Sequence, residues 1–249
     1  MILQDIGMVL VSSSRSKAYL QILLKHDIKP SHVIMIDHQR ETLLPGQRIS
    51  DVSQSQEIKD SSVPKKKSQD YFNPEEQLIE TLTKHHISHE IIYSQDVNNP
   101  HVISALKNRR EKYFIYSGFG GGILKSDILN IGKDFIHIHS GLIPSYRGST
   151  TIYYSILNEN KCTATAFFLN EHLDSGDIIK IKEFPKPKNG ETIDFIYDAH
   201  IRSLLLLEVL QEYIKIGAFK RRAQSAQQGE TYFIIHPVLK HLAILTCKK

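Results

Sequence analysis

Two histidines one residue apart, His137 and His139, have the types and the spacing best suited to chemistry in this sequence. They end an apolar segment and open the turn-like stretch HIHSGLIPSYRG, residues 137–148. In a β-strand, residues i and i+2 point to the same side, so the two imidazoles would face one way together. Three interpretations are open at this point: a proton-transfer site, a metal site, or two polar residues at the end of a strand.

A second stretch, LDSGD at residues 173–177, supplies carboxylates. Asp, Ser and Gly favour turns through local hydrogen bonds, so by itself the stretch indicates only a turn. Beside a histidine, however, a carboxylate would hold the imidazole in one tautomer and raise its basicity. Together with the histidines, the stretch becomes a candidate for a histidine–carboxylate pair.

A glycine-rich stretch, SGFGGGILKSD at residues 117–127, follows a predicted strand and precedes a predicted helix. It matches neither common phosphate-binding template. Ile123 stands where a dinucleotide-binding loop has its third glycine, and Leu124 precedes Lys125 where a P-loop has glycine. We interpret the stretch as a flexible turn that lets the backbone approach a neighbour or a ligand.

The elements that must position these residues follow from the apolar pattern. Five short apolar runs are predicted strands: residues 6–11, 33–36, 89–94, 113–117 and 135–139. Segments with helical spacing separate them, which is typical of a parallel sheet with helices on both faces. The fold class expected is therefore α/β, a Rossmann-like open, mostly parallel sheet flanked by helices, with a small C-terminal appendage. Ligands of such sheets bind outside the carboxyl ends of the strands, where the histidine pair lies.

The pattern changes after the histidine pair. A helix is predicted near 150–157, followed by paired strands at 163–169 and 177–184. One long amphipathic helix is predicted at 192–216, with Thr192 as its cap. The last thirty or so residues form an appendage whose structure the pattern does not define.

Composition restricts the class of protein. The chain has 249 residues, 41% hydrophobic and 23% charged, which is ordinary for a globular protein. A net charge of +4 is too weak to indicate nucleic acid by itself, and Cys162 and Cys247 alone form no disulfide framework. No apolar run approaches the roughly 20 residues of a membrane span, and the N-terminus lacks the basic region of a signal peptide. We expect a cytoplasmic protein without nucleic-acid or membrane partners.

In these stretches, the sequence resembles the formyltransferases that use 10-formyltetrahydrofolate. That family has Asn-x-His, a small residue, Ser, Leu-Leu-Pro and Arg-Gly or Lys-Gly, with Leu-Asp-x-Gly further along. HIHSGLIPSYRG and HLDSGDII follow in that order here. AQSAQQGETYF, residues 223–233, is similar to a Gln-x-x-x-x-Gly-x-Thr-Tyr stretch of longer members.

The resemblance implies roles for individual residues. The family's catalytic histidine and aspartate correspond to His139 and Asp174, and His137 occupies the position of a catalytic asparagine. A histidine with a pKa near the working pH would shuttle protons from the amine to the folate nitrogen, with Asp174 orienting it. His137 would supply a donor to the oxygen of the formyl group, as the asparagine amide does.

The resemblance also implies binding residues for the folate and for the amine. The serine and the folate-binding Leu-Leu-Pro segment of the family correspond to Gly141, Leu142, Ile143 and Pro144. Tyr146 and Arg147 follow directly and are candidates for contact with the acceptor. The formyltransferase-like catalytic domain would span residues 1–190, with a long polar loop or insertion at 38–74. The long helix and a small C-terminal extension would occupy residues 191–249.

The function implied is transfer of a formyl group from 10-formyltetrahydrofolate, a co-substrate, to a primary amine. The chain leaves no room for the further domain of the tRNA enzymes and is longer than the purine-pathway enzymes. A nucleotide-linked amino sugar of polysaccharide biosynthesis is therefore the expected acceptor. We expect small-molecule substrates as partners and keep a homodimer as an option.

Two alternative functions remain open. A hydrolase would use the same histidine and aspartate to release formate from the folate, with water as the nucleophile. The protein would be a metal-dependent or non-catalytic member of the family if His137, in place of asparagine, had changed the reaction. His137, His139 and Asp174 form a donor set that zinc or iron(II) accepts. The resemblance argues against a metal, since the family needs none.

Overall fold

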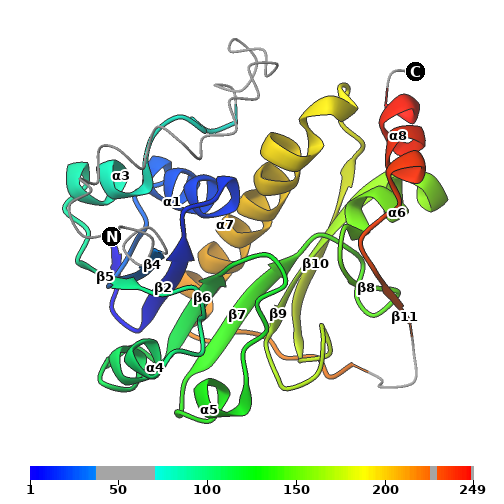
Figure 1. Ribbon diagram of the computed structural model, residues 1–249. Coiled ribbons are helices and arrows are strands. Elements are labelled where there is room, and N and C mark those ends of the chain that lie inside the picture. Colours follow the sequence, from blue (N-terminus) through cyan, green and yellow to red (C-terminus); the bar gives the residue numbers. More distant parts are fainter. Residues whose placement is uncertain (38–70, 225–228, 248–249) are drawn as a thin grey trace, which may run out of the picture.

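A mixed sheet with the strand order β10-β9-β7-β6-β2-β4-β5 forms the centre of the protein (Figure 1). Its strands are β2 (Ile6–Val11), β4 (Val33–Asp37), β5 (His89–Tyr93), β6 (Tyr113–Ser117), β7 (Asp134–His139), β9 (Lys161–Phe168) and β10 (Ile178–Pro185). The first five run parallel, and β9 pairs antiparallel with β7 and β10. The computed structural model describes residues 1–37, 71–224 and 229–247. Most of the predicted polar loop at 38–74 therefore lies outside the described residues.

Helices cover both faces of this sheet. They are α1 (Ser14–Lys25), α3 (Leu78–Lys84), α4 (Pro100–Lys107), α5 (Ser126–Leu129), α6 (Thr151–Glu159), α7 (Asp198–Ile216) and α8 (Pro237–Thr246). On one face, α1 and α7 share a hydrophobic cluster with Ile136 and Ile138 of β7. On the other, α4 and α5 pack with Phe114 and Phe135. The predicted α/β class with a mostly parallel sheet is confirmed.

Burial on both faces explains the composition of the central strands. All six residues of β2, IGMVLV, are buried, as expected for a parallel strand covered by helices on both sides. The alternation along β7 follows the same rule, because Ile136 and Ile138 face α7 while Phe135 packs on the opposite side. His137 and His139 therefore lie on the face opposite α7.

The start of α1 marks the carboxyl edge of the sheet. Ser13 caps the helix by accepting a hydrogen bond from the backbone N–H of Ser16. Arg15, in the first turn, donates to Ser117 Oγ (2.9 Å) and to the carbonyl of Gly118 (2.6 Å), at the end of β6. The first turn of α1 therefore lies beside the end of β6, next to the strand that carries the two histidines.

The long C-terminal helix begins later than the sequence predicts. Gly190–Thr192 forms a 3₁₀ turn and Ile193–Tyr197 a π-helical turn before α7 starts at Asp198. Thr192 does not cap the helix, since its hydroxyl donates to the carbonyl of Asn189 instead (2.9 Å). Asp194 in the π turn accepts hydrogen bonds from Tyr153 of α6 and Lys240 of α8. These tertiary contacts favour the irregular turn over a regular helix start.

The C-terminal appendage folds back onto the segment after β7. β11 (Glu230–Tyr232) pairs in parallel with β8 (Tyr146–Gly148), and α8 packs against α6. Figure 1 shows this pair and α8 at one side of the sheet, next to β10. A further short parallel pair joins β1 (Ile2–Leu3) and β3 (Lys29–Pro30).

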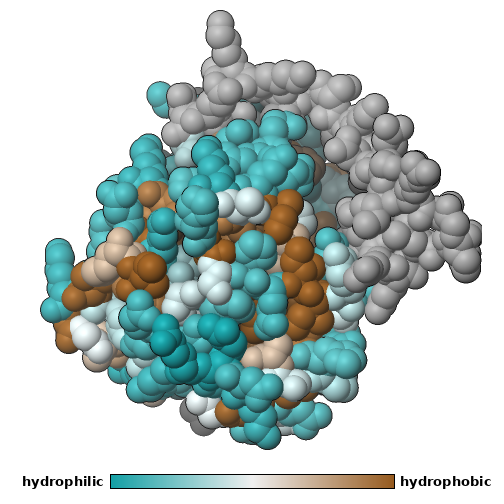
Figure 2. All heavy atoms as spheres, turned by 90° about the vertical axis from the view of Figure 1, so that its left-hand side faces the viewer, coloured by the Kyte–Doolittle hydropathy of each residue, from teal (hydrophilic) through white to brown (hydrophobic). Residues whose placement is uncertain are grey.

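The opposite side of the molecule, with α3, α4 and the edge strand β5, carries mostly hydrophilic side chains with smaller hydrophobic groups between them (Figure 2). It lies at the far edge of the sheet from β9 and β10. Within residues 1–37, 71–224 and 229–247, each helix is too short or too polar to cross a membrane.

Candidate active site

His139 ends β7 with both ring nitrogens engaged. Only 4% of the residue is exposed. Nε2 lies 2.8 Å from the carbonyl oxygen of Tyr146 and 3.1 Å from Thr151 Oγ1. The Thr151 hydroxyl donates its proton to the carbonyl of Ser140 (2.5 Å), so its oxygen acts as an acceptor toward the imidazole. Nε2 therefore carries a proton, and Nδ1 is the nitrogen of His139 that titrates.

Asp174 faces that second nitrogen. Its Oδ2 lies 3.5 Å from Nδ1 of His139 and accepts a hydrogen bond from the backbone N–H of Gly148 (2.8 Å). Asp174 is 8% exposed and adopts a left-handed conformation, with φ 48°, within the tight turn 173–177. Burial lowers the pKa of His139, and the carboxylate of Asp174 opposes this shift. The structure thus brings together the histidine and the aspartate that the sequence analysis paired.

Gly141 is required next to this imidazole. A Cβ atom at this position would lie 2.8 Å from His139 Nε2 and 2.9 Å from Thr151 Oγ1, closer than real side chains approach. The geometry of this chain therefore disfavours a side chain at position 141, where the resembled family has serine. Gly141 is itself buried, so it shapes the site through its backbone.

His137 lies two residues before His139 on the same face of β7. Its Nδ1 is 3.1 Å from the carbonyl oxygen of Tyr116, and its ring packs edge-on against Phe167 at a centroid distance of 5.9 Å. Burial, followed by the charges of Arg15 and Arg202, holds the pKa of His137 well below its usual range. The ring is therefore neutral at neutral pH.

The predicted folate segment is divided between core and surface. Ile143 is fully buried against Phe167 and Ile178 and is followed by a cis peptide bond to Pro144. Leu142 and Pro144 remain partly exposed. These two residues, rather than Ile143, offer side-chain surface to a ligand.

The predicted acceptor-binding residues contact the C-terminal part of the chain. The ring of Tyr146 is buried and stacks on Tyr232 at 5.2 Å, while its carbonyl serves His139. Arg147 donates to Gln224 Oε1 (3.1 Å), and its Nε is buried with no hydrogen-bond partner among the described residues. A contact of either side chain with substrate stays a prediction.

A joint metal site does not follow from this arrangement. No group of three His, Cys, Asp or Glu residues in the described part of the chain is placed to hold a metal ion. Nδ1 of His137 points at the carbonyl of Tyr116, and Nε2 of His139 points at that of Tyr146. The geometry gives the metal alternative no support.

A known protein family matches much of this chain. Residues 34–200, more than half of the chain, match the family model described as "Formyl transferase". The chain belongs to the formyl transferase family. The family resemblance read from the motifs is therefore confirmed.

Individual members of the formyl transferase family match parts of the chain. It is 31% identical to methionyl-tRNA formyltransferase of Ehrlichia canis over 133 residues, which cover 52% of this chain and 44% of that protein. It is 29% identical to the Helicobacter pylori enzyme of the same name over 153 residues, 59% of this chain and 48% of that protein. The matched part thus spans just under half the length of these curated relatives.

Solved structures of family members share the fold over nearly all of the chain. A sugar N-formyltransferase from Shewanella sp. matches with a TM-score of 0.57 and 15% identity, covering 98% of this chain and 88% of that chain. An N-formyltransferase from Helicobacter canadensis, in complex with folinic acid and dTDP-3-aminofucose, matches with a TM-score of 0.56 and 17% identity over 93% and 71%. At these identities the likeness shows the fold alone.

Several residues that hold the site together were missed by the sequence analysis. Thr151 binds His139 from the start of α6, and Arg202 of α7 donates to the carbonyl of Ile138 (2.8 Å) while pairing with Asp198. Each is polar and partly or fully buried, but each acts across a long sequence separation. Only Gln224 carried a signal, as the first residue of the family-like stretch 223–233.

Gln224 joins Arg147 to the turn that carries Asp174. Its Nε2 donates to the carbonyls of Asp174 (3.2 Å) and Gly176 (2.6 Å), while its Oε1 accepts from Arg147. Removing the amide would release the turn and let the carboxylate of Asp174 move away from His139. Small displacements of catalytic groups lower the reaction rate strongly.

We therefore expect Gln224→Ala to lower kcat roughly 10-fold with a smaller change in KM. Steady-state kinetics would measure this, with Gln211→Ala on α7 as the matched control. An unchanged kcat in Gln224→Ala would show that the turn holds Asp174 without this amide.

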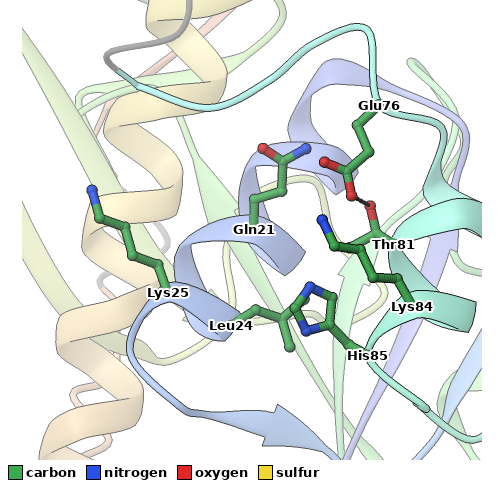
Figure 3. A pocket seen from close by; sticks show the side chains of 7 residues that line it. All are labelled: Gln21, Leu24, Lys25, Glu76, Thr81, Lys84 and His85. Atoms are coloured by element: carbon green, nitrogen blue, oxygen red, sulfur yellow. Dashed lines mark hydrogen bonds between the residues drawn. The ribbon is translucent and has the colours of Figure 1, made fainter.

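A cavity of about 240 Å³ lies elsewhere, between α1 and α3 (Figure 3). It is lined by Gln21, Leu24, Lys25, Glu76, Thr81, Lys84 and His85. Thr81 Oγ1 donates to Glu76 across one side of it (3.0 Å). The lining residues of α1 belong to its second half, whereas its first turn lies at the carboxyl edge of the sheet. The cavity is therefore separate from the histidine site.

Proposed function

We propose that this chain is an N-formyltransferase that moves the formyl group of 10-formyltetrahydrofolate to a primary amine. The observation that carries the proposal is the buried pair of His139 and Asp174, 3.5 Å apart, beside His137 at the end of β7. Family membership supplies the reaction class, and the geometry supplies groups suited to proton transfer at the carboxyl edge of the sheet.

We assign catalytic roles to His137, His139 and Asp174. The reaction needs a neutral amine, a place for its proton, and stabilisation of the oxygen of the formyl group as that oxygen gains charge. Asp174 favours the protonated form of His139, whose Nε2–H is held by the carbonyl of Tyr146. Burial lowers the pKa of His139, and Asp174 limits this shift, so that protonation of the ring during the reaction would place positive charge next to the strand end and stabilise an oxyanion formed there.

The residues around the site fit a folate co-substrate, which supplies the formyl carbon and receives a proton on its nitrogen. Leu142 and Pro144 offer apolar surface next to the histidines. After β6, neither Gly120 nor Gly121 would bring a Cβ within 4 Å of another atom, so this loop leaves open space at the neighbouring strand end. We propose these segments as the walls of the folate site, with the buried Gly141 and Ile143 supporting them from behind.

The acceptor we propose is the amino group of a nucleotide-linked amino sugar. A solved sugar N-formyltransferase and an N-formyltransferase in complex with dTDP-3-aminofucose match this chain over more than nine tenths of its length. We assign Tyr146 and Arg147 to the acceptor side. Methionyl-tRNA is the competing acceptor, favoured by the names of the curated relatives, although these match over less than half of their own length.

One experiment separates these acceptors. The protein is incubated with 10-formyltetrahydrofolate and, in separate arms, with dTDP- and UDP-linked amino sugars, with initiator methionyl-tRNA, or without acceptor. We expect release of tetrahydrofolate and a formylated product with an amino-sugar nucleotide, at a rate at least about 10²-fold above the arm without acceptor. The N-acetylated form of the same nucleotide sugar is the control, because its nitrogen is not nucleophilic.

Each other outcome contradicts part of the proposal. Equal release of tetrahydrofolate with and without an acceptor would make the protein a formyltetrahydrofolate hydrolase. Formylation of the tRNA with none of the sugars would replace the acceptor and keep the reaction. Absence of turnover in every arm would leave a non-catalytic member of the family and contradict the proposed function.

A further inference from the structure

The two ring nitrogens of His137 have different surroundings. Nδ1 faces the carbonyl oxygen of Tyr116 at 3.1 Å. A carbonyl only accepts hydrogen bonds, so Nδ1 must carry a proton. Nε2 has no hydrogen-bond partner among the described residues and is not among their fully enclosed polar atoms. In a neutral ring with Nδ1 protonated, Nε2 presents a lone pair to the site.

Burial, followed by the charges around it, keeps His137 in this neutral form. Arg15 from α1, Arg202 from α7 and His139 from β7 all disfavour a positive charge on the ring. Tyr116 of β6 contributes its carbonyl, and the packed side chain of Phe167 from β9 is apolar. The carbonyl of Tyr116 favours the protonated ring, but burial and these positive charges outweigh it. The resting ring is therefore neutral, and the lone pair of Nε2 is available to a proton donor.

His139 lacks such a free nitrogen. Its Nε2–H is held by Tyr146 and Thr151, and its Nδ1 faces Asp174. Of these two histidines, His137 is therefore the one with a ring nitrogen free to accept a proton from an incoming amine. An asparagine at this position would offer an amide donor and a carbonyl oxygen, but no basic nitrogen.

We propose that Nε2 of His137 is the base that receives the proton of the attacking amine. The proposal rests on the proposed function and assigns a role within that site. It replaces the expectation that His137 donates a hydrogen bond to the formyl oxygen, because the tautomer fixed by Tyr116 leaves an acceptor where asparagine has a donor.

The step balances without a further reactant. The amine nitrogen forms a bond to the formyl carbon, and the electron pair of the C=O bond moves to oxygen. Nε2 takes one proton from the amine nitrogen. As the bond from carbon to the folate nitrogen breaks, Nε2 returns this proton to the folate nitrogen, and the C=O bond forms again. The products are the formamide and tetrahydrofolate.

The first test is kinetic. We expect His137→Asn, which restores the residue of the resembling family, to lower kcat by about 10²-fold, and imidazole in the buffer to restore activity to His137→Ala. In both proteins, kcat/KM should fall at low pH as the acceptor amine becomes protonated. The unchanged protein should show a further fall below the ordinary histidine pKa of 6.5, where His137 becomes protonated, and this further fall should be absent in His137→Asn. His101→Asn, on the exposed start of α4, is the matched control.

The second test does not need activity. Nitrogen-15 NMR of the labelled full chain, with His137→Asn to assign the signal, reports which ring nitrogen carries the proton. We expect Nδ1–H with an unprotonated Nε2 between pH 6.5 and 8. An Nε2–H tautomer, or full activity in His137→Asn, would overturn the inference even if formyl transfer occurs. The expected tautomer without any formyl transfer would instead refute the proposed function.

Discussion

Asp174→Asn is expected to lower kcat by about 10³-fold while the protein stays folded. Asparagine has nearly the size of aspartate and tolerates the left-handed backbone at φ 48°. Its side-chain oxygen still accepts the hydrogen bond from Gly148 N–H, which Oδ2 of Asp174 accepts now. What is lost is the negative charge 3.5 Å from Nδ1 of His139, which favours the protonated imidazole.

Kinetics and thermal unfolding together test this expectation. The melting temperature of Asp174→Asn should lie within a few degrees of the unchanged protein, and KM should change far less than kcat. Asp177→Asn is the matched control. The side chain of Asp177 is more exposed than that of Asp174, and it forms a surface ion pair with Arg221 at 3.9 Å. If Asp174→Asn keeps more than a third of kcat, the charge of this carboxylate on His139 does not contribute to the reaction.

The meeting of His139 and Asp174 could be predicted because each residue lies in a local pattern. The apolar alternation around His137 and His139 marks a strand end, and the turn formers around Asp174 mark a loop. The route of the loop did not follow from these patterns. Phe168 pairs with Ile136, so the loop after β9 starts beside the beginning of β7 and must turn back toward the end of that strand for Asp174 to reach His139.

The partners of these residues could not be predicted in the same way. Tyr116, whose carbonyl fixes the tautomer of His137, acts through its backbone, which carries no side-chain signal. Thr151 and Arg202 form their contacts through tertiary packing, so their spacing along the chain contains no pattern. A histidine at an asparagine position therefore suggested a hydrogen-bond donor, whereas the contact with Tyr116 leads us to propose an acceptor.

The appendage shows the same limit on a larger scale. β11 pairs with β8, and the backbone N–H of Ile235 donates to Thr150 Oγ1 across 85 residues of sequence. Periodicity within residues 223–233 defines no partner for such a short strand. The pairing matters for the site, because β8 contains the carbonyl of Tyr146 that holds His139 and the N–H of Gly148 that holds Asp174.

Gly148→Ala should therefore damage both stability and activity. Gly148 has φ 98°, a conformation strained for alanine, and an added Cβ would lie 2.1 Å from the carbonyl oxygen of Tyr232 in β11. Relieving that overlap separates β8 from β11 or moves the N–H that binds Asp174. We expect a loss of about 2–4 kcal/mol in the free energy of unfolding, which would lower the melting temperature by roughly 5–15 °C.

The same substitution should lower kcat in the fraction that remains folded, since the turn of Asp174 loses its backbone donor. Thermal unfolding, limited proteolysis of the C-terminal segment and kinetics below the melting temperature would measure the three effects. Gly120→Ala is the control for stability, because no atom lies within 4 Å of its added Cβ. A lower melting temperature with unchanged kcat would separate the appendage from the site and show that Asp174 holds its position without Gly148. An unchanged melting temperature would mean that the pairing of β8 with β11 does not contribute to the stability of the fold.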